Sequence, residues 1–291
     1  MSLRDRIATP EGKRRYVRAL FATIADRYDF ITVALSYGQD RRWKRRLIDL
    51  AAPGPGSRAL DLATGTGDIA FGLASRGARV VGLDITLRML ELATEKGRSP
   101  ERLALLRKGA ASRATAGARI CQTEGARAFS NSARDDRERA TVDAPKRLRR
   151  EGGQASVCFL QGDMLALPFP AASFDIVTTG YGLRNVPNLA AAIDEIGRVL
   201  ASGGQVLSLD FNRPSNALVR AAYLVYLTAV GATLGWVLHR DPDTYRYIPA
   251  SIRQYPGAEA VARMFEARGF MSVRAYPVLG GLMTIHHAVR T

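Results

Sequence analysis

The sequence contains few of the residues that bind metals or cross-link a chain. It has two cysteines, Cys121 and Cys158, and three histidines among 291 residues. The two cysteines form neither a metal-binding spacing nor a disulfide framework, which is typical of a protein in a reducing compartment. No apolar run follows the charges of residues 1–15, so we expect no signal peptide. These absences favour a cytoplasmic protein without a bound metal.

Acidic residues are also scarce, and the excess of basic ones is local. The net charge is +15; residues 1–50 contribute +6 and residues 98–155 contribute +7. The rest of the chain is nearly neutral. A basic surface can attract nucleic acid or anionic lipid, but an Arg-rich composition with solvated faces accounts for it equally well.

Short apolar runs followed by Gly, Asp, Asn or Pro predict a series of strands. They cover residues 58–63, 79–84, 156–163, 174–180 and 204–211, and residues 284–291 add a candidate last strand. Between them lie helical patterns, such as residues 188–200 with Asn188 as N-cap. Alternating strands and helices predict an α/β fold whose mostly parallel sheet is covered on both faces.

Two segments break this rhythm. Residues 98–155 contain one aromatic residue and many Arg, Ala, Ser and Gly, so they cannot bury much apolar surface. We interpret them as a basic, disordered or loosely helical insertion, which either is tolerated at the surface without a function or binds RNA.

Residues 221–238 carry no charge over a length near that of a membrane span. We interpret them as a core helix or the wall of an apolar pocket.

A glycine turn follows the first strand, in "ALDLATGTGDIA" (59–70). Gly65, Gly67 and Ala70 satisfy the pattern of a dinucleotide-binding turn, which by itself is weak evidence. Asp61 ends the strand, and its carboxylate would repel a pyrophosphate. It would instead favour the cationic sulfonium and ammonium groups of S-adenosylmethionine.

Acidic residues also follow the next two strands. Asp84 ends residues 79–84, where a carboxylate usually accepts hydrogen bonds from ribose hydroxyls. Asp163 and Met164 follow the third strand, where they could contact an adenine. Each Asp alone could be only a helix N-cap, but three in register indicate an S-adenosylmethionine-dependent methyltransferase. The expected fold is then a three-layer, doubly wound, Rossmann-like class I methyltransferase sheet with an antiparallel C-terminal strand.

Longer motifs resemble the UbiE/MenG C-methyltransferases of menaquinone and ubiquinone biosynthesis. They are residues 27–46, 61–68, 162–175, "GYGLRN" (180–185), 198–211 and "DPDTYRYIPASIRQYP" (241–256). The resemblance covers the chain except residues 98–155, and it implies one domain over 1–291 with residues 1–50 as a helical lid. Departures lie at Ile31 and Thr32, at Asp40, where the family usually has His, and at residues 201–212.

The resemblance implies that S-adenosylmethionine contacts Thr66, Asp84, Asp163, Met164 and Gly180. The implied reaction is methylation of a ring carbon of a reduced polyprenyl quinone such as demethylmenaquinol. Such a carbon becomes nucleophilic when a neighbouring phenol loses its proton, so the site needs a proton acceptor, charge stabilisation and alignment.

The same resemblance assigns catalytic roles to three residues. Arg184 would stabilise the phenolate or hold a water that accepts the proton, because guanidinium is always charged. Asn185 would orient the phenol or that water, and Tyr28 would cover the site and share in the proton relay. The alternatives are a capping Asn185, an Arg184 paired with an acid at the surface, and a Tyr28 that only packs.

Three other functions stay open at this point: methylation of another lipophilic phenol or a sterol-like acceptor, RNA binding or modification, and a non-catalytic scaffold in a quinone-synthesis assembly. No Asn-Pro-Pro-aromatic string follows the fourth strand, so we expect no specific nucleic-acid partner. The polyprenyl tail implies peripheral contact with the inner face of a membrane. A homodimer is compatible with the sequence.

Overall fold

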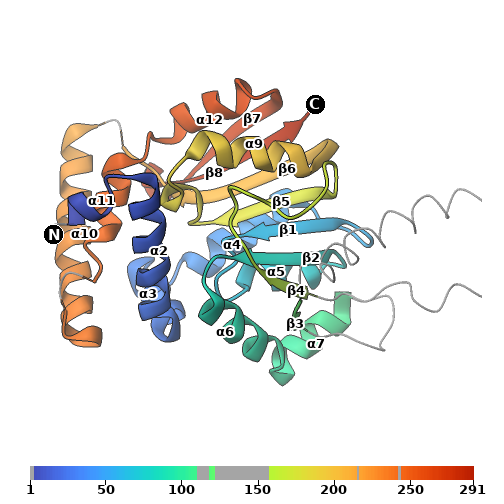
Figure 1. Cartoon of the computed structure of the whole chain (residues 1–291), viewed down its shortest axis with the longest axis horizontal. Helices are drawn as coiled ribbons and strands as arrows, with labels where there is room; N and C mark the ends of the chain where they lie inside the picture. Colours follow the sequence, from blue (N-terminus) through green and yellow to red (C-terminus); the bar gives the residue numbers. More distant parts are fainter. Residues whose placement is uncertain (1–2, 110–117, 122–156, 215, 242–243) are drawn as a thin grey trace, which may run out of the picture.

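The computed structural model describes residues 3–109, 118–121, 157–214, 216–241 and 244–291. Its centre is an eight-stranded sheet with the order β3-β4-β2-β1-β5-β6-β8-β7 (Figure 1). The strands are β1 (Arg58–Leu62), β2 (Arg79–Asp84), β3 (Ala118–Ile120), β4 (Val157–Gln161), β5 (Phe174–Gly180), β6 (Leu200–Phe211), β7 (Phe270–Val278) and β8 (Met283–Arg290). The strands predicted at the sequence level are all present, and β3 and β7 are additional.

The pairing confirms the expected α/β class. β1 pairs in parallel with β2 and β5, and the parallel pairing extends outward to β3 on one side and β6 on the other. β8 runs antiparallel to both β6 and β7. The carboxyl ends of the parallel strands therefore meet at one edge of the sheet, where open α/β folds bind their ligands.

Helices cover both faces of the sheet. In chain order they are α1 (Leu3–Arg6), α2 (Pro10–Ile24), α3 (Tyr28–Leu35), α4 (Asp40–Ala51), α5 (Asp68–Ala74), α6 (Leu87–Gly97), α7 (Pro100–Gly109), α9 (Leu189–Val199), α10 (Ala217–His239), α11 (Tyr247–Gln254) and α12 (Ala258–Glu266). Three short 3-10 turns, η1 (Ala25–Arg27), η2 (Leu183–Asn185) and η3 (Leu279–Gly281), complete the described elements.

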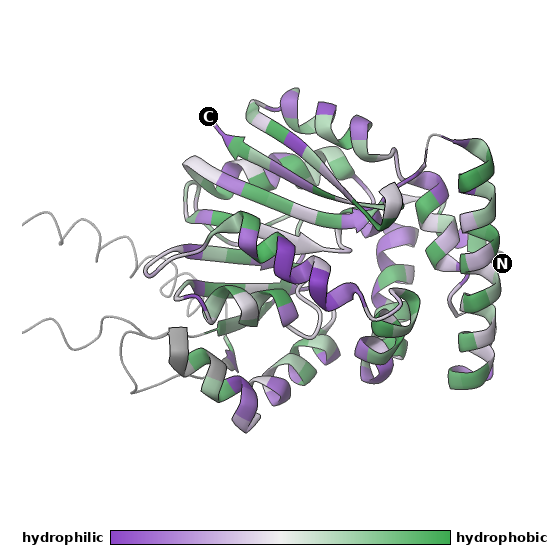
Figure 2. Ribbon diagram, turned by 180° about the vertical axis from the view of Figure 1, so that it is seen from behind, coloured by the Kyte–Doolittle hydropathy of each residue, from purple (hydrophilic) through white to green (hydrophobic). Residues whose placement is uncertain are grey.

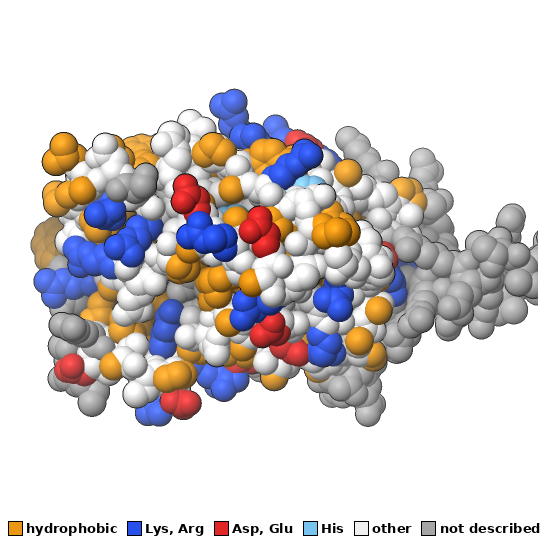
Figure 3. Space-filling view, turned by 90° about the horizontal axis from the view of Figure 1, so that it is seen from above, with side chains coloured by type: hydrophobic (Ala, Val, Ile, Leu, Met, Phe, Trp, Pro, Cys, Tyr) orange, Lys and Arg blue, Asp and Glu red, His pale blue; other side chains and the backbone are white. Residues whose placement is uncertain are grey.

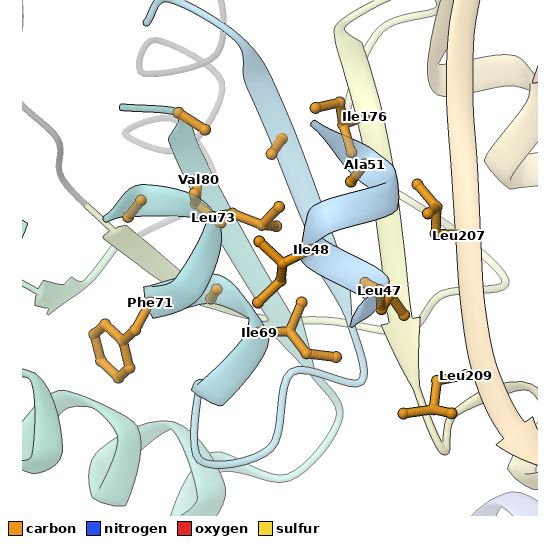
Figure 4. Packing of buried hydrophobic residues seen from close by; sticks show 14 of the residues in the cluster. Leu47, Ile48, Ala51, Ile69, Phe71, Leu73, Val80, Ile176, Leu207 and Leu209 are labelled. Carbon is orange, nitrogen blue, oxygen red and sulfur yellow. The ribbon is translucent and has the colours of Figure 1, made fainter. Parts of the chain in front are cut away.

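Alternating side chains of the strands serve two separate cores. Ala59 of β1 packs with α4 and α5, whose Leu47 and Leu73 are fully buried (Figure 4). Its neighbour Leu60 packs in the other core, with α9 and α12. Because successive residues of a strand point to opposite faces, this split is what three layers require.

Four helices form a cap beside the carboxyl edge of the sheet. α2, α3, α10 and α11 lie together at the end of the molecule that carries the N-terminus (Figure 1). α2 and α3 are connected by η1, and α10 contacts both α3 and α11. The predicted N-terminal helical lid is therefore joined by α10 and α11 from the second half of the chain.

One prediction from the sequence is wrong. Cys121 and Cys158 form a disulfide, with their Cα atoms 5.8 Å apart. The backbone N–H of Cys121 donates to the carbonyl of Phe159, so β3 and β4 bring the two cysteines onto neighbouring strands. Their separation of 37 residues hid this proximity, because β3 lies within the segment interpreted as an insertion. Of that segment, residues 98–109 include the described helix α7, and residues 110–117 and 122–155 lie outside the described residues.

Candidate active site

Two cavities meet at the carboxyl edge of the sheet. The first is lined by residues that follow β1, β2, β4 and β5, and by one side of α2. It contains five of the residues predicted to bind the cofactor: Gly65, Asp84, Asp163, Met164 and Gly180. Asn185, predicted to be catalytic, also lines it. We call this space the cofactor cavity.

Asp84 is the best-defined polar group of the cofactor cavity. Its Oδ2 accepts the backbone N–H of Gly65 at 2.9 Å, and its Oδ1 accepts that of Thr86 at 2.8 Å. Burial raises the pKa of Asp84, against the opposing effect of these bonds. A carboxylate has about four acceptor positions, so this one can still accept hydrogen bonds from a diol.

The glycine turn needs its glycines for two reasons. Gly65 and Gly67 have φ angles of 53° and 82°, in the left-handed region that disfavours a side chain. A Cβ on Gly67 would also lie 2.9 Å from the rings of Phe71 and Phe159. Gly67 is the residue before α5, so this turn directs the N-terminus of the helix toward the sheet edge.

Asp61 and Thr66 are close to the cofactor cavity but do not line it. Asp61 is buried beneath it and accepts hydrogen bonds from the hydroxyls of Thr64 at 2.6 Å and Thr178 at 2.7 Å. Burial raises the pKa of Asp61 to about 6. The Thr66 hydroxyl donates to Asp29 of α3, at 2.6 Å. In this conformation Asp61 therefore stabilises the glycine turn and Thr66 connects it to α3, and neither side chain faces the cofactor cavity.

The cap closes over the cofactor cavity. Arg14 of α2 forms an ion pair with Asp163, and Val17 and Phe21 of the same helix also line the cavity. The space that remains is about 80 Å³. Ligand sites commonly have ~300 Å³ or more, so in this conformation α2 leaves less space than a nucleoside needs.

The second cavity is larger and apolar, with a volume of about 450 Å³. It runs between α3, α10 and α11, and its lining includes Trp43, Phe211, Tyr223, Tyr245 and Leu282. The uncharged helix predicted over 221–238 thus forms a cavity wall, and the alternative of a core helix is wrong because most of its residues are exposed or half-buried. We call this space the substrate cavity.

Tyr28 and Tyr181 separate the two spaces, since each lines both of them. Burial raises the pKa of Tyr28 to about 12, while the charge of Lys44 opposes this. Burial also raises the pKa of Tyr181 well above its usual value. Both phenols are therefore protonated at neutral pH.

Arg184 lines the substrate cavity and is held on several sides. Its Nε lies 3.0 Å from Oδ1 of Asp210, and its Nη1 donates to Ser251 at 2.9 Å and to Asn185 at 3.3 Å. The guanidinium also lies 4.8 Å from the ring centroid of Phe211. Asn185 turns the other way and donates from Nδ2 to the Tyr181 carbonyl at 2.7 Å.

The sequence did not single out the residues that hold Arg184. Asp210, which is 1% exposed, accepts the Arg184 backbone N–H with its second oxygen. It ends its strand as Asp61 and Asp84 end theirs, and that shared position was an available signal. Lys13 of α2 donates to the carbonyls of Arg184 and Val186. Its contact is long-range in the sequence and could not be predicted.

Solved structures of known proteins share this architecture. A SAM-dependent methyltransferase from Thermotoga maritima matches with a TM-score of 0.55 and 14% identity, over 94% of this chain and all of that one. An S-adenosylmethionine-dependent methyltransferase structure from Methanococcus maripaludis matches with a TM-score of 0.51 and 17% identity, over 93% of each chain. The fold is that of the class I S-adenosylmethionine-dependent methyltransferases.

The family follows from the sequence comparisons. The model of the ubiE/COQ5 methyltransferase family matches residues 9–106 and 128–290, so the chain belongs to this family. It is 35% identical to the demethylmenaquinone methyltransferase of Thermus thermophilus, over 92% of this chain and 98% of that protein. It is 31% identical to the ubiquinone/menaquinone biosynthesis C-methyltransferase UbiE of Shewanella pealeana, over 95% and 91%. The expected enzyme class and cofactor are thereby confirmed.

S-adenosylmethionine fits the residues of the cofactor cavity. Asp84 would accept the ribose hydroxyls, and Asp163 with Met164 and Leu83 would face the adenine. Gly65 and Gly180, which also line this cavity, would lie beside the chain that carries the sulfonium. When bound, the cofactor would supply an electrophilic methyl group beside Tyr28 and Tyr181.

Proposed function

We propose that the chain methylates a ring carbon of a reduced polyprenyl quinone, with S-adenosylmethionine as the methyl donor. The observation that carries this proposal is the apolar substrate cavity, which meets the cofactor cavity at Tyr28 and Tyr181. Among the described residues, Arg184 is the one cation in its lining. A flat quinol head with an isoprenoid tail needs such a space. The relatives named for demethylmenaquinone and ubiquinone methylation support the same substrate class.

Arg184 stabilises the phenolate form of the quinol in this proposal. Asp210 and Ser251 fix the guanidinium, so it does not need to reorganise when the negative charge develops. Preorganised charge of this kind lowers the barrier most in a cavity that excludes water. Asn185 holds the backbone of Tyr181, and Tyr28 covers the junction where the methyl group would pass.

The test is mass spectrometry of quinones after incubation with isotopically labelled S-adenosylmethionine and reduced demethylmenaquinone. We expect one labelled methyl group on the ring. Arg184→Ala should lower kcat by about 10²–10³-fold, the loss typical of removing one charge-stabilising donor, with cofactor binding largely kept. Methylation of other lipophilic phenols, but of no quinol, would contradict the proposal.

We also propose that α10 is the surface through which the enzyme contacts a membrane. It is the one described helix long and apolar enough to span a bilayer, and 22% of its most apolar window is buried. Tyr223, Leu227, Gly231 and Gly235 face inward. Because this face packs against α3 and α11, we interpret the helix as lying on a membrane rather than crossing it.

The outward face of α10 has the chemistry of an interfacial helix. Leu218, Val225, Trp236 and Val237 are 82%, 69%, 65% and 61% exposed. Figure 2 shows the helix mostly green and white along its length. Arg220 and Arg240 stand near its two ends, and Figure 3 shows hydrophobic side chains beside Lys and Arg at this end of the molecule. Apolar area with flanking cations favours an anionic bilayer.

Vesicle flotation tests this surface. We expect the chain to float with vesicles that contain anionic lipid, and Val225→Glu with Val237→Glu to abolish flotation. Met271→Glu is the matched control, because Met271 is 56% exposed on β7, away from α10. If the same α10 variants leave flotation intact and convert a dimer into a monomer, the face is a homodimer interface and the membrane proposal is wrong.

A further inference from the structure

Methylation of a quinol must release a proton, and the described structure offers few groups to accept it. None of the three histidines, His239, His286 and His287, lines either cavity. Asp210 is already committed, because its two oxygens bond Arg184 and the backbone N–H of Phe211. A different carboxylate is reached through the wall between the cavities.

That carboxylate is Asp40, the first residue of α4. The hydroxyl of Tyr181 donates to its Oδ1 at 2.6 Å, and the side chain is 2% exposed. Tyr181 itself lines both the cofactor and the substrate cavities. Its φ of 62° is unusual for a non-glycine residue, so the backbone holds this ring at a cost.

The other oxygen of Asp40 faces a different environment. Lys44 lies 2.7 Å from Oδ2 and also bonds Asp68 at 3.1 Å. Asp40 and Lys44 belong to the lining of a third, polar cavity of about 320 Å³, together with Asp29, Asp68, Lys96 and Arg102. Asp40 therefore stands in a wall, with the Tyr181 phenol from the reaction side on one oxygen and a polar cavity lined by charged residues beyond the other.

We propose that Tyr181 and Asp40 form the route by which the quinol proton leaves the active site. This inference rests on the proposed function. The quinol O–H bond breaks and its proton passes to the Tyr181 oxygen, while the proton of Tyr181 passes to Oδ1 of Asp40. The electron pair of the broken bond remains on the quinol as phenolate. Asp40 then releases the proton to water in the polar cavity.

The charges around Asp40 suit this role. Lys44 of the same helix lies 2.7 Å from Asp40, and Asp68 of α5, 3.1 Å from the same ammonium, offsets part of its charge. Tyr28 of α3 also interacts with Asp40, and burial raises the pKa of Tyr28 to about 12, so it stays neutral. Arg184, across the cavity, holds the phenolate once its proton has left.

Asp40 is one of the departures from the family resemblance described for the sequence, and its carboxylate is a group that can accept a proton. Tyr181 supplies the hydroxyl that connects this group to the cavity. A bond that served only to join α4 to the segment after β5 would need neither a titratable group nor a lining hydroxyl.

The test uses the full chain, a reduced short-chain quinone analogue and pH-rate profiles. We expect Tyr181→Phe and Asp40→Asn each to lower kcat by about 10²-fold, a typical contribution of a positioned proton acceptor. The double variant should lose no more than either single one. The lost rate should return as pH rises, because the quinol then ionises in solution. The Kd of S-adenosylmethionine should stay unchanged.

Two variants separate proton transfer from packing. Asp40→His should recover part of kcat and lose it again as pH falls through the imidazole pKa. Asp49→Asn, on the same helix in an exposed pair with Arg76, should match the parent enzyme. Single variants with a wild-type pH profile, whether their rates fall or not, would overturn the proton route. If the parent enzyme methylates no quinol, the proposed function fails instead.

Discussion

The cofactor cavity and the substrate cavity share a wall but differ in how they are built. The first is made from turns that directly follow parallel strands, and its polar groups are fixed by backbone N–H donors, as Asp84 is by Gly65 and Thr86. The second is made mostly from helix side chains of the cap, and its lining is apolar apart from a few polar groups such as Arg184. The carboxyl edge of the sheet therefore supplies most of the lining of the cofactor cavity, with α2 across it, whereas the cap supplies most of the lining of the substrate cavity.

A substitution at Asp84 tests the cofactor cavity most directly and should have the largest effect. Asp84→Ala removes the carboxylate that we expect to bind the ribose and leaves two buried backbone N–H groups without their acceptor. The Kd of S-adenosylmethionine, measured by titration calorimetry, should rise by at least ~10²-fold, since a charged hydrogen bond contributes about 1.5–3 kcal/mol and the turn is also disturbed. Unchanged affinity would place the ribose elsewhere.

Asp61, which lies close to the cofactor cavity, lowers the stability of the fold by an amount that can be measured. Burial raises the pKa of Asp61 to about 6. At neutral pH the folded state therefore contains a buried, charged carboxylate, which destabilises it relative to the protonated form. An acid whose pKa rises on folding destabilises the fold above that pKa, and the cost disappears as pH falls toward the unfolded value near ~4.

We therefore expect Asp61→Asn to gain stability relative to the parent as pH rises from about 4 to about 6. The difference in free energy of unfolding between variant and parent should shift by on the order of 2 kcal/mol over this range. Urea denaturation of both proteins at each pH measures it. A difference that does not change with pH would mean that the pKa of Asp61 is the same in the folded and unfolded states.

The tail-binding part of the substrate cavity should respond to shape, because its lining on α10 is apolar. Ala222→Trp fills the cavity wall on α10, so KM for long-tailed quinols should rise about tenfold, within the ~1–3 kcal/mol that overpacking costs. The Kd of S-adenosylmethionine should not move. Ala229→Trp, on the same helix but outside the cavity lining, is the matched control. Equal effects of the two variants would show that α10 does not select the tail.

The sequence predicted the residues of the cofactor cavity far better than those of the substrate cavity. Gly65, Asp84 and Asp163 follow apolar strands, and parallel strands bring such residues to one edge regardless of what surrounds them. The substrate cavity joins α3, α10 and η3, whose packing no local pattern records. β7 was not predicted from the sequence for a related reason. It is an edge strand whose side chains are mostly exposed, so it has no apolar run.

Residue pairs show the same limit. Arg184 was identified by its motif, but its partners Asp210 and Ser251 come from β6 and α11. The pairing of Tyr181 with Asp40 spans 141 residues, and that of Cys121 with Cys158 depends on the short β3. A motif identifies a functional residue, whereas the groups that hold it follow from tertiary packing.

The smallest effect is expected from the hydrogen bond between Ser251 and Arg184, at the edge of the substrate cavity. Ser251→Ala removes the hydroxyl that accepts from Nη1 of Arg184, while Asp210 and Phe211 still hold the guanidinium. One neutral acceptor contributes about 0.5–1.5 kcal/mol, so kcat should fall about threefold to tenfold with the Kd of S-adenosylmethionine unchanged. Ser57→Ala, in the loop before β1 and outside the lining of all three cavities, should have no effect. A weaker cofactor affinity in Ser251→Ala would mean that α11 serves the cofactor side as well, and that the two cavities are not independent.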